Sequence, residues 1–296
     1  VEAENNSSSN KIAVYYAFGD INEGKKSSTD DNGIYSNDMI DDLKKLTDDD
    51  DIKAVVLRIN SPGGDAFAAD QIWDAINKLK KKKPVVVSMG DYAASGGYYI
   101  SCNANAIVAQ PTTLTGSIGI FGMIPEVSGL TKKIGISIDN VKTNKLSDFG
   151  DISKEMNPEE QALLQMSINR GYQTFLSRCA QGRKRTKSQI NAIGQGRVWT
   201  GSEAIKIGLV DYIGGLNDAI AMAAKIAHLK DYDTESYPEK ENFLASIFSN
   251  ETTKYIKAGI MKSEIGEYFS TLGLINRVQN HIDWIQARLP YNLTIR

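Results

Sequence analysis

Short apolar runs alternate with amphipathic stretches over much of the chain. Residues 11–19, 54–60, 84–90 and 106–110 are apolar runs typical of strands, and AVVLRIN at 54–60 has the pattern of a strand buried on both faces. Between them, residues 65–83 carry apolar side chains along one helical stripe. This βαβαβ order predicts a largely parallel sheet with right-handed crossovers, and therefore an α/β fold.

The pattern weakens in the middle of the chain and becomes strongly helical again at residue 157. We expect a short helix at residues 127–135, a strand at 137–143 and an irregular stretch after it. Asn157 and Pro158, followed by two glutamates, form a strong helix start. Asparagine caps free N–H groups, proline fits the first turn, and acidic side chains favour the positive end of the helix dipole.

These patterns divide the chain into three parts. Residues 1–10 are polar and rich in serine and asparagine, which is typical of a linker. Residues 11–230 hold the alternating strands and helices and form the folded unit. Residues 231–296 have weak helical periodicity, and we expect a helical tail there. Because the chain begins with Val1 rather than methionine, we expect it to be a piece of a longer protein.

Composition and charge exclude some classes of protein. The 296 residues are 41% hydrophobic and 24% charged, with a formal net charge of -2, as in ordinary soluble domains. This balance gives no electrostatic reason to expect nucleic acid as a partner. No apolar run approaches the roughly 20 residues of a membrane span. The two cysteines, Cys102 and Cys179, are expected to be buried free thiols rather than a disulfide.

Two glycine-rich loops, SPGG at 61–64 and ASGG at 94–97, each follow a predicted strand and precede a predicted helix. In an open parallel sheet, both loops lie at the carboxyl edge, where functional sites gather. Glycine lets a substrate carbonyl approach the backbone closely, and one N–H from each loop would form an oxyanion hole. Ser95 in the second loop is then a candidate nucleophile. The alternative is that both loops are ordinary glycine turns.

A serine nucleophile needs a base to take its proton. The chain has only two histidines, His228 and His281, and both lie late in the sequence, where surface or packing roles are commoner. A Ser-His-Asp triad is therefore disfavoured. The remaining option is a lysine kept neutral by burial, as in serine-lysine dyads. Lysines are abundant, so composition does not select one. This chemistry needs no cofactor and no metal ion.

The chain resembles the C-terminal half of the long-type signal peptide peptidase A family, also called protease IV. The stretches that carry the resemblance cover most of residues 11–230. They read KAVVLRINSPGGDAFAAD, KPVVVSMGDYAASGGYYIS, TTLTGSIGIFG, NPEEQALLQMSINRGY and GRVWTGSEAIKIGLVD. The family consists of bacterial envelope serine-lysine peptidases. The resemblance implies a Clp protease/crotonase-like spiral of ββα units, here followed by the C-terminal helical tail.

The resemblance also implies roles for individual residues. Ser95 matches the family nucleophile. Gly96 matches one oxyanion donor and the SPGG loop supplies the other, with Gly63 favoured and Gly64 as the alternate. Ser117 in TGSIG matches a serine that hydrogen-bonds the catalytic lysine.

Apolar residues near the loops, namely Ile118, Ile120 and Phe121, are candidates to line a groove for hydrophobic peptides such as remnant signal peptides. Core packing is the alternative role for these three residues. In the cell, the resemblance implies membrane association through a missing N-terminal anchor, an active site on the periplasmic side, and a homotetramer.

The catalytic lysine is where the chain departs from single-unit members of the family. Alignment on residues 155–157 places Ser147 at the lysine position, and the neighbouring Lys142, Lys145 and Lys154 do not match it. In long-type members, an N-terminal unit contributes the lysine and the C-terminal unit contributes the serine. We therefore expect the base to come from an N-terminal unit of the same protein.

Three alternative functions remain open from the sequence. In the first, Lys145 reaches the site after a local shift of its loop, and the chain is a self-sufficient peptidase. In the second, the chain is a crotonase-like acyl-CoA enzyme that uses the same oxyanion hole. In the third, it is a non-catalytic scaffold. Only the peptidase readings predict covalent modification of Ser95 by a serine-reactive probe.

Overall fold

The structure is a computed structural model that describes residues 8–27, 33–238 and 285–288. Its helices are α1 (Ser36–Asp48), α2 (Ala66–Lys80), α3 (Gly96–Ser101), α4 (Ser128–Lys133), α5 (Pro158–Gly182), α6 (Lys187–Ile193), α7 (Gly201–Ala204) and α8 (Leu216–Ile226). Its strands are β1 (Lys11–Phe18), β2 (Asp20–Asn22), β3 (Gly33–Tyr35), β4 (Ile52–Ser61), β5 (Gly63–Asp65), β6 (Val85–Ala94), β7 (Ala106–Ala109), β8 (Leu114–Gly116), β9 (Phe121–Gly122), β10 (Val198–Thr200), β11 (Tyr212–Ile213), β12 (Asp233–Tyr237) and β13 (Ile285–Arg288).

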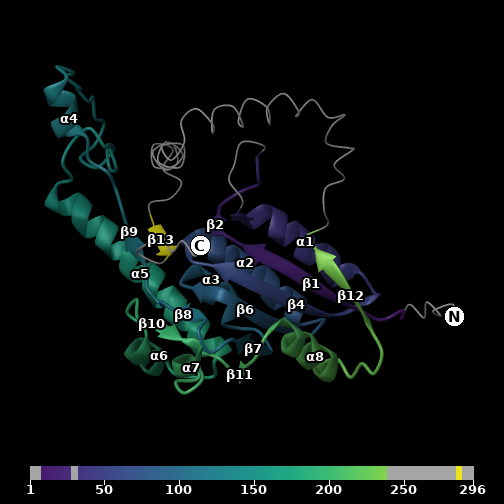
Figure 1. Cartoon of the computed structure of the whole chain (residues 1–296). Coiled ribbons are helices and arrows are strands. Elements are labelled where there is room, and N and C mark those ends of the chain that lie inside the picture. The colour runs from purple at the N-terminus through teal and green to yellow at the C-terminus, as the bar shows by residue number, and fades with distance from the viewer. Residues whose placement is uncertain (1–7, 28–32, 239–284, 289–296) are drawn as a thin grey trace, which may run out of the picture.

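The main sheet has the strand order β10-β8-β6-β4-β1-β12, and β7 pairs with both β6 and β11 (Figure 1). All of these pairs are parallel except β10 with β8. The prediction of a largely parallel α/β sheet is therefore confirmed.

Helices cover both faces of this sheet. On β1, Ala13 and Tyr15 belong to the core beneath α1, α2 and α3, whereas Ile12 and Val14 belong to the core beneath α8. Successive side chains of a strand point to opposite faces, so a strand covered on both sides must be apolar at every position. This double burial explains the continuous apolar runs in the sequence.

A smaller second sheet has the order β3-β2-β5-β13-β9. Its strands β2 and β5 follow the main-sheet strands β1 and β4 almost directly, and α1 and α2 come next in the chain. This succession gives repeated ββα units and places the second sheet at the carboxyl edge of the main sheet.

The segment between β9 and α5 extends away from the main sheet and carries α4 (Figure 1). We call residues 123–156 the arm. The predicted helix at 127–135 is confirmed in part by α4, but the strand predicted at 137–143 is wrong, because these residues form no strand. Helix α5 begins where the sequence predicts, with a capping box in which the Asn157 side chain and Glu160 satisfy each other's backbone N–H groups.

The prediction of a helical tail is wrong for the two described pieces of residues 231–296. Strand β12 pairs in parallel with β1 and so belongs to the main sheet. Strand β13 belongs to the second sheet. The rest of the predicted tail lies outside the described residues, as do residues 1–7 of the predicted linker.

Candidate functional site

Ser95 lies on a sharp turn between β6 and α3. Its backbone has φ 53° and ψ -114°, a conformation that is costly for a residue with a side chain. The Ser95 N–H donates to the Gly116 carbonyl at 2.9 Å, and the Ser95 carbonyl accepts from Tyr99 N–H at 2.8 Å. The side chain is fully buried, and its Oγ has no hydrogen-bond partner in the described part of the chain. A serine held on a strained strand–turn–helix with an unbonded hydroxyl is suited to nucleophilic attack.

Ser117 is brought next to Ser95 by the pairing of β6 with β8. Ala94 and Gly116, the last residues of the two strands, are partners in this parallel pair, and the residue that follows each of them is a serine. Ser117 is also buried and also has a positive φ, at 48°. The structure therefore gathers two of the residues selected from the sequence.

The two glycine loops meet at Gly63 and Gly96. A Cβ atom built on Gly63 would lie 2.8 Å from the Gly96 nitrogen, and one built on Gly96 would lie 3.2 Å from the Gly63 Cα. Gly64 faces elsewhere, because a Cβ atom there would overlap the backbone of Ile21 on β2. Gly63 rather than Gly64 therefore lies beside Gly96, and the Gly63 N–H donates to Ser61 Oγ at 3.2 Å.

The three apolar residues expected to line a groove have different surroundings. Ile118 is fully buried in the core, and Ile120 packs against that core, so core packing accounts for both. Phe121 is partly exposed on β9 and pairs with Gln286 of β13.

One feature of the site was missed from the sequence. The carbonyl oxygen of Ala287, on β13, lies 2.9 Å from where a Cβ atom on Gly96 would be and would overlap a Cβ atom on Gly63. No motif in IQAR signals this position, because four residues without a distinctive pattern carry no record of the distant strands they pair with.

Neither histidine offers a base to Ser95 within the described ranges. His228 is exposed and follows α8, which packs on the face of the sheet opposite α1, α2 and α3. His281 lies outside the described residues.

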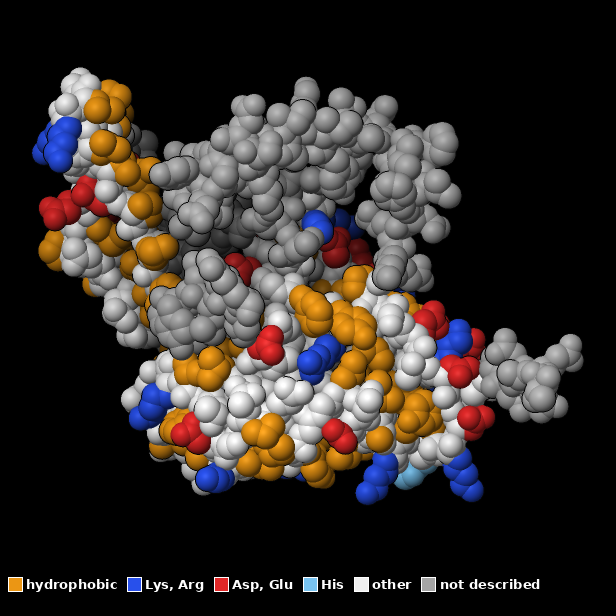
Figure 2. Space-filling view, in the orientation of Figure 1, with side chains coloured by type: hydrophobic (Ala, Val, Ile, Leu, Met, Phe, Trp, Pro, Cys, Tyr) orange, Lys and Arg blue, Asp and Glu red, His pale blue; other side chains and the backbone are white. Residues whose placement is uncertain are grey.

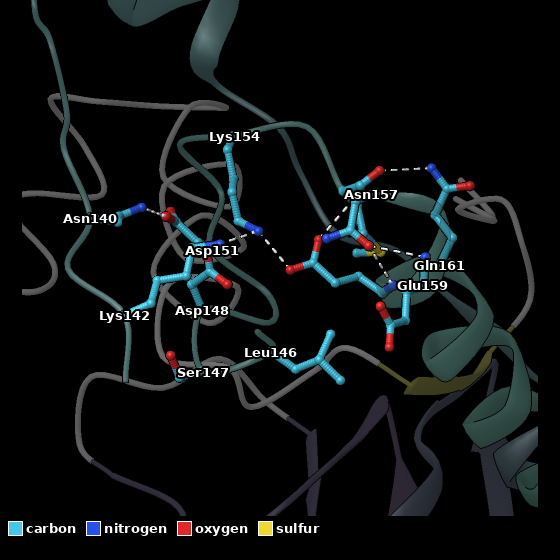
Figure 3. Close-up of polar contacts among 12 residues, drawn as sticks. Asn140, Lys142, Leu146, Ser147, Asp148, Asp151, Lys154, Asn157, Glu159 and Gln161 are labelled. Atoms are coloured by element: carbon cyan, nitrogen blue, oxygen red, sulfur yellow. Dashed lines mark hydrogen bonds and ion pairs between the residues drawn. The ribbon is translucent and has the colours of Figure 1, made fainter. Parts of the chain in front are cut away.

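The three lysines nearest the family's lysine position are held in ion pairs with acidic residues of the arm and of α5, and Figure 3 shows Lys142 and Lys154. Lys142 Nζ and Lys154 Nζ lie 2.6 and 3.0 Å from Asp148 Oδ2, and Lys154 Nζ lies 2.6 Å from Glu160 Oε1. Lys145 pairs with Glu159, and its side chain is 77% exposed. Ser147 itself is exposed, and its hydroxyl donates to the Asn144 carbonyl.

These ion pairs make Lys154 unsuited to act as a base. Its hydrogen bond to Glu160 raises its pKa, so the amine stays protonated near neutral pH.

Burial lowers the pKa of Lys80 and Lys83, but both lie near the start of β6, whereas Ser95 follows the end of that strand. Ten strand residues separate the two ends by roughly 33 Å.

The ion pairs of the arm lead to a prediction about the pKa of Glu160. Hydrogen bonds from Lys154 lower the pKa of Glu160, and those from Lys142 lower the pKa of Asp148. These carboxylates stabilise the arm fully above their ordinary pKa values of about 4, and this contribution is lost as the pH falls through the lowered values. We expect Lys154→Met to raise the pKa of the buried Glu160, measured by carbon NMR of its carboxyl. Lys145→Met, the matched control, should leave that pKa unchanged, and an unchanged pKa in Lys154→Met would contradict the assignment.

Both cysteines are free and buried, as predicted. In the described ranges, no group of three or more His, Cys, Asp or Glu side chains is arranged to hold a metal ion. None of the helices in those ranges combines the length and the apolar character needed to cross a lipid bilayer.

Residues 77–230 match the model of peptidase family S49, and residues 27–113 match that of the Clp protease family. The chain therefore belongs to peptidase family S49, and the prediction of a Clp protease-like α/β fold is confirmed.

Two curated relatives that cover most of this chain are much longer than it. It is 43% identical to Protease 4 of Salmonella typhi, over 81% of this chain and 38% of that protein. It is 35% identical to the chloroplastic serine protease SPPA of Arabidopsis thaliana, over 94% of this chain and 40% of that protein. The chain thus spans about two fifths of the length of these relatives. A solved structure of ClpP1 from Listeria monocytogenes aligns with a TM-score of 0.46 and 17% identity, over 70% of this chain and 94% of that one.

Proposed function

We propose that this chain is the nucleophile-bearing unit of a serine peptidase. The observation that carries the proposal is the meeting of the Ser95 turn with the backbones of Gly63 and Gly96. Membership of a peptidase family supports the same reading.

The reaction proceeds through an acyl-enzyme. Ser95 Oγ attacks the peptide carbonyl carbon while a neutral lysine takes its proton, and the Gly63 and Gly96 N–H groups bind the developing oxyanion. The lysine then gives the proton to the leaving amine, and water hydrolyses the ester. Ser117 orients the lysine. A base is needed from outside the described residues, because Ser95 Oγ has no partner within them.

We assign the lysine to an N-terminal unit of the same protein, and the arm supplies a surface for such a unit or for further copies. Figure 2 shows apolar side chains gathered on this projection, where at least half of each of six side chains is exposed. They are Met123, Leu130, Ile134, Ile136, Ile138 and Val141. Exposed apolar surface of this kind is typical of protein interfaces. A tetramer of full-length chains is consistent with it.

The substrates that fit this site are extended hydrophobic peptides, of which remnant signal peptides are an example. We place the protein in the bacterial cell envelope, anchored in the membrane through a preceding segment, with Ser95 on the periplasmic side. This assignment rests on the family resemblance of the motifs around Ser95 and Ser117.

Covalent labelling tests the proposal. The chain is assembled with its N-terminal unit and treated with a fluorophosphonate, and the modified peptide is identified by mass spectrometry. We expect the label on Ser95 alone, with none on the exposed Ser147. Absence of label from a folded assembly, or label that persists in Ser95→Ala, would favour a scaffold or an acyl-CoA enzyme without a serine nucleophile.

The two glycine loops make a further prediction. Gly63→Ala should lower kcat by on the order of 10²–10³, because the new methyl group and the positive φ of 106° displace the oxyanion donor. Gly64→Ala should instead lower the free energy of unfolding, because its methyl group would overlap the backbone of Ile21. Kinetics and urea unfolding of both variants check this. The opposite result would assign the oxyanion donor to Gly64: Gly64→Ala would fold but lose turnover, and Gly63→Ala would remain active.

A further inference from the structure

One carboxylate joins α2, α3 and α5. Asp70 lies on α2, and its Oδ1 accepts from the Tyr99 hydroxyl of α3 at 2.8 Å. The same oxygen accepts from Arg178 Nε of α5 at 2.9 Å, and Oδ2 accepts from Arg178 Nη2 at 3.3 Å. Asp70 therefore ties together helices from three separate parts of the sequence.

Tyr99 connects this carboxylate to the Ser95 turn. The Tyr99 N–H donates to the Ser95 carbonyl at 2.8 Å and closes the first turn of α3. Its ring is buried and packs on Phe175, with ring centroids 4.4 Å apart. Burial and the nearby Asp70 raise the pKa of Tyr99, so the hydroxyl keeps its proton and donates a hydrogen bond to the carboxylate. Tyr99 thus holds the turn with its backbone and Asp70 with its side chain.

Arg178 restrains the carboxylate from α5. Its guanidinium carbon lies 4.0 Å from the centre of the Trp73 ring, which is a cation–π contact. Trp73 is buried and follows Asp70 by three residues on α2, so the two side chains are neighbours on that helix. Arg178 is held by the ring and by the carboxylate together, and two parallel charge-assisted hydrogen bonds restrict the position of both partners.

The two glycine loops depend on the helices that follow them. Helix α2 begins directly after the strand that holds Gly63, and α3 begins with Gly96. Neither glycine has a side chain that could fix the loops to each other, and a Cβ atom on Gly63 would lie 2.8 Å from the Gly96 nitrogen. The spacing of the two backbones is therefore set by how α3 packs against α2, and the hydrogen bond from Tyr99 to Asp70 links these helices directly.

An error in this spacing would be costly to the proposed reaction. Oxyanion donors must lie about 2.7–3.1 Å from the position of the oxyanion. A misplacement of about 1 Å lowers a rate by on the order of 10²-fold. We propose that Asp70 is a positioning residue, which through Tyr99 sets the place of the Gly96 N–H relative to Gly63. This inference rests on the proposed peptidase function and adds to it a residue that does not touch the substrate.

Removal of one hydroxyl group tests the proposal. Tyr99→Phe keeps the ring on Phe175 and removes only the donor to Asp70. In the full chain assembled with its N-terminal unit, we expect kcat for a short peptide ester to fall by about 10- to 100-fold. We expect KM to stay unchanged, because the oxyanion hole acts in the transition state and not on the bound ester.

Tyr15→Phe is the matched control. Tyr15 is also buried, and its hydroxyl also donates to an aspartate, Asp42, at 3.3 Å, but this pair links β1 to α1. Both variants should lower the midpoint of urea unfolding, and Tyr15→Phe should leave kcat unchanged. An equal fall of kcat in the two variants, or no fall in Tyr99→Phe, would overturn the inference.

Two variants of Asp70 separate hydrogen bonding from charge. Asp70→Ala removes the acceptor and should lower kcat at least as much as Tyr99→Phe. Asp70→Asn removes the charge but keeps an oxygen that accepts from the Tyr99 hydroxyl, so it should recover most of that loss. If Asp70→Asn is as slow as Asp70→Ala, Asp70 does not act by positioning α3 and the inference fails. Should Tyr99→Phe not fold, this comparison decides in its place.

A measurement without catalysis separates this inference from the peptidase proposal. The amide proton and nitrogen shifts of Gly96 are recorded by NMR in the 296-residue chain and in its Tyr99→Phe and Tyr15→Phe variants. We expect Tyr99→Phe to move the Gly96 resonance by more than its line width, and Tyr15→Phe to leave it in place. If this pattern holds while the unchanged assembly shows no turnover, the peptidase proposal fails and the positioning of Gly96 stands. If the Gly96 resonance stays in place in Tyr99→Phe, the inference fails.

Discussion

Ser95→Ala should lower peptidase turnover of the assembled protein by on the order of 10⁴-fold or more, the loss typical of removing a serine nucleophile. The reason is direct, since in the proposed mechanism Ser95 Oγ is the atom that attacks the substrate. The fold should survive, because Ser95 Oγ makes no hydrogen bond to any described residue, so its removal leaves none of their buried polar groups without a partner. Alanine also carries a Cβ atom, so the strained turn at φ 53° is no harder to form than with serine.

Turnover and urea unfolding together check this prediction. The free energy of unfolding should change by less than about 1 kcal/mol. Ser202→Ala, at an exposed serine on α7, serves as the matched control and should keep full turnover. Turnover within tenfold of the unchanged protein, with folding intact, would show that Ser95 is not the nucleophile.

The 296-residue chain alone should fold but should not hydrolyse short peptide esters. The two core clusters of the main sheet are built from residues of this chain, so its folding does not require another unit. In the proposed mechanism, catalysis does require another unit. Lys142, Lys145 and Lys154 are engaged with acidic side chains of the arm and of α5, and a hydroxyl at position 147 is not a base near neutral pH.

Adding an N-terminal unit that carries a lysine should restore hydrolysis. The experiment compares ester hydrolysis by the chain alone, by the chain with that unit, and by the chain with a unit whose lysine is replaced by methionine. Lysine within about 3 Å of Ser95 Oγ is needed for proton transfer, so the methionine unit should give no recovery. Robust hydrolysis by the isolated chain that Lys145→Ala abolishes would instead show an internal dyad.

Much of the fold was predictable because its signals are local. Residues 54–57 and 85–87 are apolar without interruption, and strands covered on both faces need that pattern. Asn157 and Pro158 place the start of α5 through capping chemistry that acts within one turn. The strand prediction for residues 137–143 was wrong because no local signal could show whether a partner strand is present. The apolar residues of this segment lie on an exposed arm, where strand propensity without a pairing partner forms no strand.

The candidate site also has features that local sequence predicts and features that depend on long-range pairing. The sequence by itself determined the two glycine loops and Ser95, because a strand–turn–helix with glycines is a local pattern. Only the tertiary structure decided that Gly63 faces Gly96 while Gly64 packs on Ile21, and that β13 lies between β5 and β9. Those facts depend on pairing between segments far apart in the chain. Such pairing is set by the geometry of the assembled core, and no short stretch of sequence records it.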